Sequence, residues 1–261
     1  MNSPLLFQVP ALMIAAMLFL LLILANGLGF RIRKMQLKKN QDQLPDWSDS
    51  LEGSLMGLMA LILAFSFGIA ASKFDARREM IVQEANDIGT ALLRCDLYPD
   101  STRNLLRADF QKYVEARISY YDAGDDSLRI KAALKEADRY SSGIWNRVVL
   151  IAGNPGNTVP SMQMIPALNS MIDIVTTRDA GRIAKVPPVI LTVLLILTLI
   201  SGFLAGYSDK KKKRNLITVI GFAAMLSITL YLVLELDRPR RGIINLDAAE
   251  QRIVDIRTMF N

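Results

Sequence analysis

The sequence predicts an all-α integral membrane protein with four transmembrane helices and a helical-bundle domain inserted between the second and the third. Four apolar stretches without a central charge predict the helices, and a polar segment of more than a hundred residues predicts the domain. About 20 apolar residues cross a hydrocarbon core of about 30 Å, and lipid requires their backbone to be helical. We expect residues 1–72 to form a first transmembrane hairpin, 73–186 the domain, 187–236 a second hairpin and 237–261 a tail with a short helix.

The four apolar stretches run over residues 9–30, 51–72, 187–207 and 216–236. The residues before Val9 carry no charge and a basic run follows the first stretch, which is the reverse of a secretory signal peptide. We therefore expect the first helix to remain in the protein. A buried core helix is the alternative interpretation of the third and fourth stretches.

The composition argues against enzymes and against nucleic-acid partners. The 261 residues are 51% hydrophobic and 21% charged, with a net charge of +6, one cysteine and no histidine. The basic residues cluster where apolar helices end, so they indicate anionic lipid headgroups and topology rather than nucleic acid. Without histidine the chain lacks the commonest general base and metal ligand, and it carries no zinc pattern, Walker loop or nucleophile elbow. We expect no enzyme, no cofactor and no metal site, and the lone Cys95 cannot form an intrachain disulfide.

An even number of crossings places the domain and both termini on one side of the membrane and the two short loops on the other. The loops carry Arg31, Arg33, Lys34, Lys38, Lys39, the lysines 210–213 and Arg214. The opposite ends carry Lys73, Arg77, Arg78, Arg178, Arg182, Lys185, Arg238, Arg240 and Arg241. The count is ten against nine, but the density in the short loops favours loops in the cytoplasm and a domain outside.

The polar segment predicts an antiparallel bundle, because its apolar residues recur at three- and four-residue spacing. We expect the second span to continue as a helix towards Pro99, a second helix capped by Asp100 or Ser101, a third over 126–152, a loop at 153–160 and a fourth helix towards Pro187.

The C-terminal tail should end in a short helix. Asp247 is a candidate cap for it, and Ile253 and Ile256 should pack on the bundle or on a neighbouring subunit. Residues 241–245 are a candidate extended segment.

The second span has small residues along one narrow face. They are Gly53, Gly57, Ala60, Ala64, Gly68 and Ala71. Small residues let helices approach closely in lipid, so this face predicts association with a neighbouring helix, and ordinary packing within the chain is the alternative.

A second stripe on the same helix is polar at both ends and apolar between them. It consists of Ser54, Leu58, Leu61, Phe65, Ile69 and Ser72. If several copies surround an axis, this stripe could line a pore with a hydrophobic constriction that gates by dewetting. Contact with lipid is the alternative.

Acids and arginines follow the second and the fourth span. This charged collar consists of Asp75, Arg77, Arg78, Glu235, Asp237, Arg238, Arg240 and Arg241. Ion pairs that fix the helix ends are one interpretation. A ring of surplus arginines that concentrates anions is the other.

The run from Ala60 to Arg94, with Glu84, Ala85 and Asn86, and the run from Glu235 to Gly242 resemble a bacterial family of bestrophin-like membrane proteins of unknown function. Bestrophins proper are pentameric anion channels whose second transmembrane helix forms an apolar neck. The resemblance implies a bacterial inner-membrane protein with its domain and termini in the cytoplasm, in conflict with the charge density.

The chain departs from bestrophins in two respects. The positions similar to the neck are Leu61, Phe65 and Ile69, with one aromatic among them. No acidic calcium clasp follows Glu235, so calcium gating is not implied.

Our leading hypothesis is therefore a homo-oligomeric channel or channel-like pore for small ions, with anions slightly favoured. Its expected partners are membrane lipids, copies of itself and small ions. The alternative is a membrane-anchored sensory or scaffolding protein whose domain binds a partner. A lipid-interacting protein that reads headgroups through residues 210–214 is the third possibility.

Overall fold

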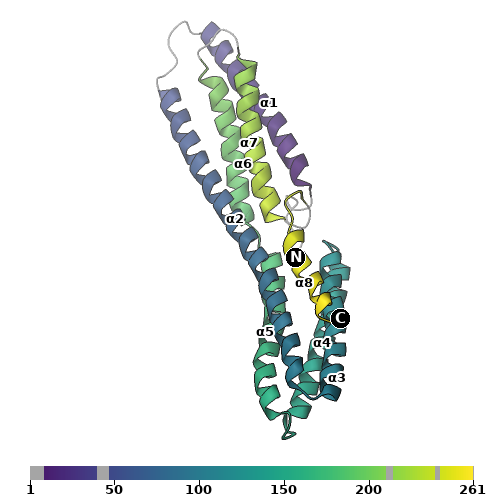
Figure 1. Cartoon of the computed structure of the whole chain (residues 1–261). Coiled ribbons are helices and arrows are strands. Elements are labelled where there is room, and N and C mark those ends of the chain that lie inside the picture. The colour runs from purple at the N-terminus through teal and green to yellow at the C-terminus, as the bar shows by residue number, and fades with distance from the viewer. Residues whose placement is uncertain (1–8, 40–46, 210–213, 239–241, 261) are drawn as a thin grey trace. The chain divides into compact units, whose positions relative to one another are not determined.

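The computed structural model describes residues 9–39, 47–209, 214–238 and 242–260 (Figure 1). Within these ranges the regular structure is entirely helical. The chain divides into two compact units, which we describe separately.

The helices follow one another as α1 Ala11–Lys39, α2 Trp47–Arg94, η2 Cys95–Leu97, α3 Asp100–Asp122, α4 Ser127–Ala152, α5 Thr158–Ile183, α6 Pro188–Tyr207, α7 Leu216–Asp237, α8 Asp247–Asp255 and η3 Ile256–Phe260. Four stretches of helix are long and apolar enough to cross a membrane, and they lie in α1, in α2, in the segment that ends with α6, and in α7.

The first unit comprises Met1–Lys73 and Lys185–Arg238, and thus α1, the first half of α2, α6 and α7. Helix α1 packs along α6 and α7. Apolar side chains on these helices are almost fully buried, and they include Leu18, Leu22, Leu191, Leu194, Leu230 and Val233. These side chains thus form a core that α1, α6 and α7 share.

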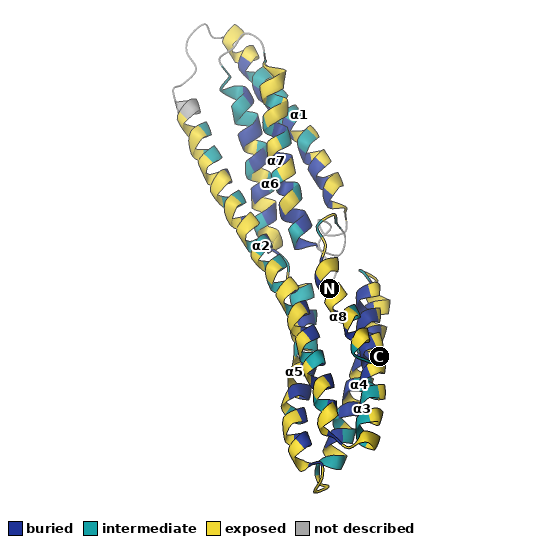
Figure 2. Cartoon of the chain, viewed as in Figure 1, coloured by how far each residue is buried: buried dark blue, intermediate teal, exposed yellow. Residues whose placement is uncertain are grey.

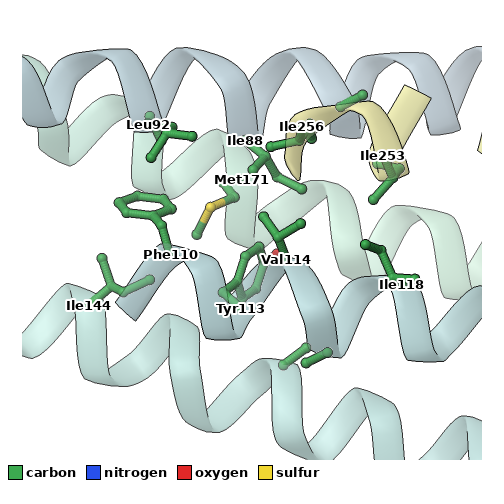
Figure 3. Close-up of a cluster of buried hydrophobic side chains, with 14 of the residues drawn as sticks. Ile88, Leu92, Phe110, Tyr113, Val114, Ile118, Ile144, Met171, Ile253 and Ile256 are labelled. Atoms are coloured by element: carbon green, nitrogen blue, oxygen red, sulfur yellow. The ribbon is translucent and has the colours of Figure 1, made fainter. Parts of the chain in front are cut away.

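The second unit comprises Phe74–Ala184 and Pro239–Asn261. In it, α3 packs against α4, α4 packs against α5, and α8 and η3 pack on α3. Its core joins five helices and η3 (Figure 3), with Ile88, Leu92, Phe110, Tyr113, Val114, Ile118, Ile144, Met171, Ile253 and Ile256. The expectation that Ile253 and Ile256 pack on the bundle is met, because they are 0% and 5% exposed.

The turn between α3 and α4 follows local chemistry. Gly124 has φ +53, a conformation that costs glycine little. The Asp126 carboxylate caps α4 by accepting hydrogen bonds from the backbone N–H groups of Leu128 (2.9 Å) and Arg129 (3.2 Å).

Two expected helix caps were wrong. Neither Asp100 nor Ser101 caps α3, which follows Pro99 and has no side-chain cap, and Asp100 pairs with Arg103 at 3.0 Å instead. Asp247 does not cap α8 but lies in its first turn.

The loop expected at 153–160 ends earlier, since α5 begins at Thr158. Residues 242–244 form bends and no extended segment, while 241 lies outside the described residues.

Candidate pore-facing surface and buried charged centre

The first half of α2 has one side that packs in the first unit. Met59, Ser66 and Ala70 are 4%, 0% and 0% exposed, and Ile62 and Leu63 pack against the same core. The Ser66 hydroxyl donates to the Ile62 carbonyl oxygen at 2.7 Å, so this buried polar group is satisfied within its own helix. The remaining sides of this half-helix are largely exposed (Figure 2).

The predicted pore stripe lies on these exposed sides. Leu58, Leu61 and Phe65 are 45%, 53% and 62% exposed. Ser54 and Ser72 are exposed as well, whereas Ile69 is partly buried against the core. Within one protomer the stripe is thus available to lipid, to another copy or to a pore.

The small-residue face is also exposed. A Cβ added at Gly53, Gly57 or Gly68 meets no described heavy atom within 4 Å. Ala60 and Ala64 are exposed, and Ala71 is partly buried. The described part of the chain leaves this face largely uncovered, and its association with a neighbouring copy stays a prediction.

Helices α1 and α6 approach each other closely in the first unit, a contact that was not predicted from the sequence. A Cβ on Gly29 would come within 2.1 Å of the Phe203 carbonyl oxygen, and one on Gly206 within 2.0 Å of the Asn26 carbonyl oxygen. The Asn26 side-chain amide donates to the Gly202 carbonyl oxygen at 3.2 Å. The signal was present in the sequence, because Gly202 and Gly206 form a G-x-x-x-G pair in an apolar helix.

Two arginines of the basic loops reinforce this contact. Arg33 donates to the Tyr207 carbonyl oxygen (3.1 Å) at the end of α6. Arg214 donates to the Asn26 side-chain oxygen and to the Ile23 carbonyl oxygen, both at 2.9 Å. These cations therefore bind helix carbonyls in addition to any effect on topology.

The charged collar distributes over both units. In the second unit Asp75 and Arg78 are exposed, whereas Arg77 is buried. Arg77 donates to the carbonyl oxygens of Gly181 (3.1 Å) and Ala184 (2.5 Å), which end α5. A cation there is favourable, because the last carbonyls of a helix have no partner within it.

In the first unit Glu235, Asp237 and Arg238 are buried. The Asp237 carboxylate accepts from the Val186 backbone N–H at 2.9 Å, and Arg238 donates to the Val9 carbonyl oxygen at 2.6 Å. Arg240 and Arg241 lie outside the described residues. Asp237 and Arg238 thus bind the backbone just before α6 and just before α1. A cationic ring formed by the collar of several copies stays a prediction.

A buried charged centre in the second unit joins α2, α3 and α5. The Glu84 carboxylate is fully buried and accepts from Arg117 Nε at 2.5 Å, from an Arg178 guanidinium nitrogen, and from the Tyr121 hydroxyl at 3.3 Å. Arg178 also contacts the Tyr121 hydroxyl. The guanidinium carbons of Arg117 and Arg178 lie 4.6 Å from the ring centres of Tyr120 and Tyr121, respectively.

The charges of this centre are mutually dependent. Burial alone would raise the pKa of Glu84, but the charges and hydrogen bonds of Arg117 and Arg178 outweigh it and hold that pKa below its ordinary value. Burial alone would lower the pKa of Arg117, and the Glu84 charge raises it instead. Burial and the Glu84 charge raise the pKa of Tyr121, so its hydroxyl stays protonated.

This centre was not predicted from the sequence, in which Arg178 resembles one of the basic residues beside the membrane and no motif marks Arg117. A signal existed for Glu84, since it falls on the same helical stripe as Ile81 and Ile88, both of which are buried. Across the described ranges, no group of three or more carboxylate or cysteine side chains is placed to hold a metal ion.

Known proteins share the fold of this chain. Three solved structures of a bacterial Bestrophin homolog from Klebsiella pneumoniae share the fold, with TM-scores of 0.71, 0.70 and 0.69 at 12%, 11% and 12% sequence identity. They cover 94%, 93% and 92% of this chain and 97%, 98% and 97% of their own. No curated protein matches the sequence. The Bestrophin-like domain family matches residues 11–250, most of the chain, and the protein therefore belongs to that family.

Proposed function

We propose that the chain forms a homo-oligomeric membrane channel for small ions, with the first half of α2 nearest the symmetry axis. The observation that carries this proposal is the exposed apolar stripe on α2, in which Phe65 is 62% exposed in a single protomer. Family membership and the bestrophin-like fold support a channel-type role.

The chemistry of the stripe suits a hydrophobic constriction. Leu58, Leu61 and Phe65 are exposed and apolar, and the hydroxyls of Ser54 and Ser72 lie beyond them at either end. A narrow apolar segment excludes water unless it widens, and polar ends admit hydrated ions to it. No single helix can enclose such a path, so several copies are required.

The small-residue face supplies a means of assembly. Gly53, Gly57 and Gly68 are uncovered by the described part of their own chain and permit close approach by a helix of a neighbouring copy. The resemblance to bestrophins favours five subunits and a preference for anions, and the surplus arginines of the charged collar favour the same sign of ion.

Four crossings, with the second unit between the second and third, complete the proposed arrangement. The lengths and compositions of the four apolar helices support it. We place the protein in the inner membrane of a bacterium, on the basis of the resemblance.

The decisive experiment measures ion flux in liposomes that contain the purified full-length chain. Chloride and potassium flux should exceed that of empty vesicles, and Phe65→Ala should increase it roughly threefold or more by widening the constriction. Leu24→Ala is the matched control, because Leu24 lies on α1 and is 61% exposed.

Flux indistinguishable from empty vesicles across voltages and salts would reject the channel. Particle images that show a lone subunit, or a ring with Phe65 turned towards lipid, would reject the assembly. Chloride flux no faster than potassium flux would reject the anion preference alone.

A second candidate function is partner binding by the second unit. Large apolar side chains are exposed on both sides of the α4–α5 turn, and Leu150, Val159 and Met162 are 81%, 72% and 68% exposed. Such exposure is typical of an interaction surface. A monomeric protein without flux would favour this candidate.

A further inference from the structure

We propose that a cavity in the first unit binds the headgroup of an aminophospholipid, a lipid that carries a phosphodiester and a primary ammonium group. The cavity has a volume of about 500 Å³. It is lined by residues of α1, α2, α6 and α7 and by described residues next to the ends of α6 and α7, and its lining includes Asn26, Glu52, Met56, Ser208, Asp209, Val219 and Phe222. This proposal is independent of the channel function.

Glu52 supplies the group that would recognise the ammonium. It is half-buried at the start of the second apolar stretch, and among the described residues no cation lies within ion-pair distance of its carboxylate. The free-energy cost of partly burying a carboxylate is offset when it accepts charge-assisted hydrogen bonds. An ammonium group provides three such donors.

A positive group lies beside the same cavity. The Arg214 guanidinium binds the side-chain oxygen of Asn26, which lines the cavity, at 2.9 Å. Two carboxylates, Glu52 and Asp209, line the cavity, and Asp209 has an interaction of its own. The Glu52 carboxylate and the Arg214 guanidinium are complementary to a headgroup that carries both a positive and a negative charge. A simple anion or a simple cation would satisfy one of them and face the other.

The cavity also offers a polar group without a partner. The Ser208 Oγ atom is buried, lines the cavity and has no hydrogen-bond partner within the described ranges. A phosphodiester oxygen could accept a hydrogen bond from it. A buried hydroxyl that is left unsatisfied costs free energy, so occupancy of the cavity by an acceptor is favourable.

The remaining walls favour a lipid over a water-soluble amine. Met56, Val219 and Phe222 present apolar surface from the membrane helices α2 and α7. The cavity lies at the helix ends, because Ser208 directly follows α6 and Thr218 belongs to the first turn of α7. That level corresponds to the boundary between hydrocarbon and headgroups, where an amphiphile places its polar group.

Native mass spectrometry of the full-length protein in mild detergent tests the proposal. The probes are phosphatidylethanolamine, phosphatidylglycerol with the same acyl chains, and free ethanolamine. We expect saturable binding of phosphatidylethanolamine, binding of phosphatidylglycerol weaker by about tenfold, and no binding of free ethanolamine.

Glu52→Gln keeps the shape of the side chain and removes its charge, so it should weaken phosphatidylethanolamine binding by about tenfold. Glu79→Gln, at an exposed position in the second unit, is the matched control and should leave binding unchanged. Equal binding of both lipids, or unchanged binding in Glu52→Gln, would overturn the proposal, and binding of free ethanolamine would overturn the assignment to a lipid. The measurement needs no ion flux, so a failure here and a failure of the channel are distinguishable.

Discussion

At the scale of single residues, the buried Glu84 joins three helices of the second unit. Its side chain is 0% exposed and binds two arginines from two other helices. A buried pair gains little over an apolar core of the same shape, but the removal of one partner leaves an uncompensated charge and costs about 3–5 kcal/mol. Here the loss of the Glu84 carboxylate would leave two buried guanidinium groups without their carboxylate partner.

We therefore expect Glu84→Gln to destabilise the second unit by about 3 kcal/mol or more. Chemical denaturation in mild detergent measures this loss of stability. Unfolding is followed by the fluorescence of Trp145, which packs against the same core. Glu115→Gln is the matched control, because Glu115 pairs with Arg257 at 2.6 Å at the surface, where both side chains are about half exposed. An exposed pair contributes at most about 1 kcal/mol.

The pH dependence of stability provides a second readout. The pKa of Glu84 lies below its ordinary value in the folded protein, so the unfolded chain binds the proton more tightly. The contribution of Glu84 is complete above the ordinary carboxyl pKa of about 4.3 and is lost as the pH falls through the lower folded value. Glu84→Gln should flatten this acid branch, and an unchanged branch would contradict the role of Glu84.

At the scale of helices, the contact between α1 and α6 depends on glycine. Gly206 and Gly29 approach the facing backbone so closely that no side chain fits between the helices. A backbone carbonyl cannot move aside as a flexible side chain can. Substitution must therefore push the helices apart and break the contact of Asn26 with Gly202.

Gly206→Ala should lower the free energy of unfolding of the first unit by about 1–3 kcal/mol, as overpacking does. Thermal unfolding in detergent, followed by helical circular dichroism, measures the change. Gly221→Ala is the matched control in α7, where a Cβ meets nothing within 4 Å. If both variants unfold at the same temperature, the close contact does not stabilise the unit.

The helices could be predicted from the sequence, but their caps could not. Hydrophobic length and periodicity were sufficient for the helices, because each long helix has a pattern that extends over many residues. The caps at Asp100 and Asp247 were misassigned, because a single polar residue near a helix start is a weak signal and the preceding Pro99 or Asn245 competes with it.

Contacts between residues far apart in the chain could not be predicted from the sequence. Arg178 beside the apolar stretch resembles a topology signal, yet its partner Glu84 lies 94 positions earlier in the chain. The six small residues of α2 form the longer motif, but the shorter motif of Gly202 and Gly206 makes the close contact. Only the packed structure distinguishes a small-residue face that is filled from one that is uncovered.

At the scale of the whole molecule, function depends on how the chain crosses the membrane. Four crossings require that the α4–α5 turn and the two termini share one side and that the segment between α6 and α7 lies on the other. The charge density of the short loops favours a domain outside, and the resemblance to bestrophins favours a domain in the cytoplasm. One labelling experiment separates these outcomes.

We expect Asn154→Cys and Lys211→Cys to react oppositely with a membrane-impermeant maleimide on intact cells. The native Cys95 should stay silent, because it is fully buried and burial raises the pKa of its thiol to about 12, so almost no thiolate is present at pH 7. Asn154 is exposed in the α4–α5 turn. Labelling of Lys211→Cys alone places the domain in the cytoplasm and labelling of Asn154→Cys alone places it outside, with permeabilised cells as the control in which both react. If both variants label alike in intact cells, the number of crossings between them is even, and the proposed four-helix topology is wrong.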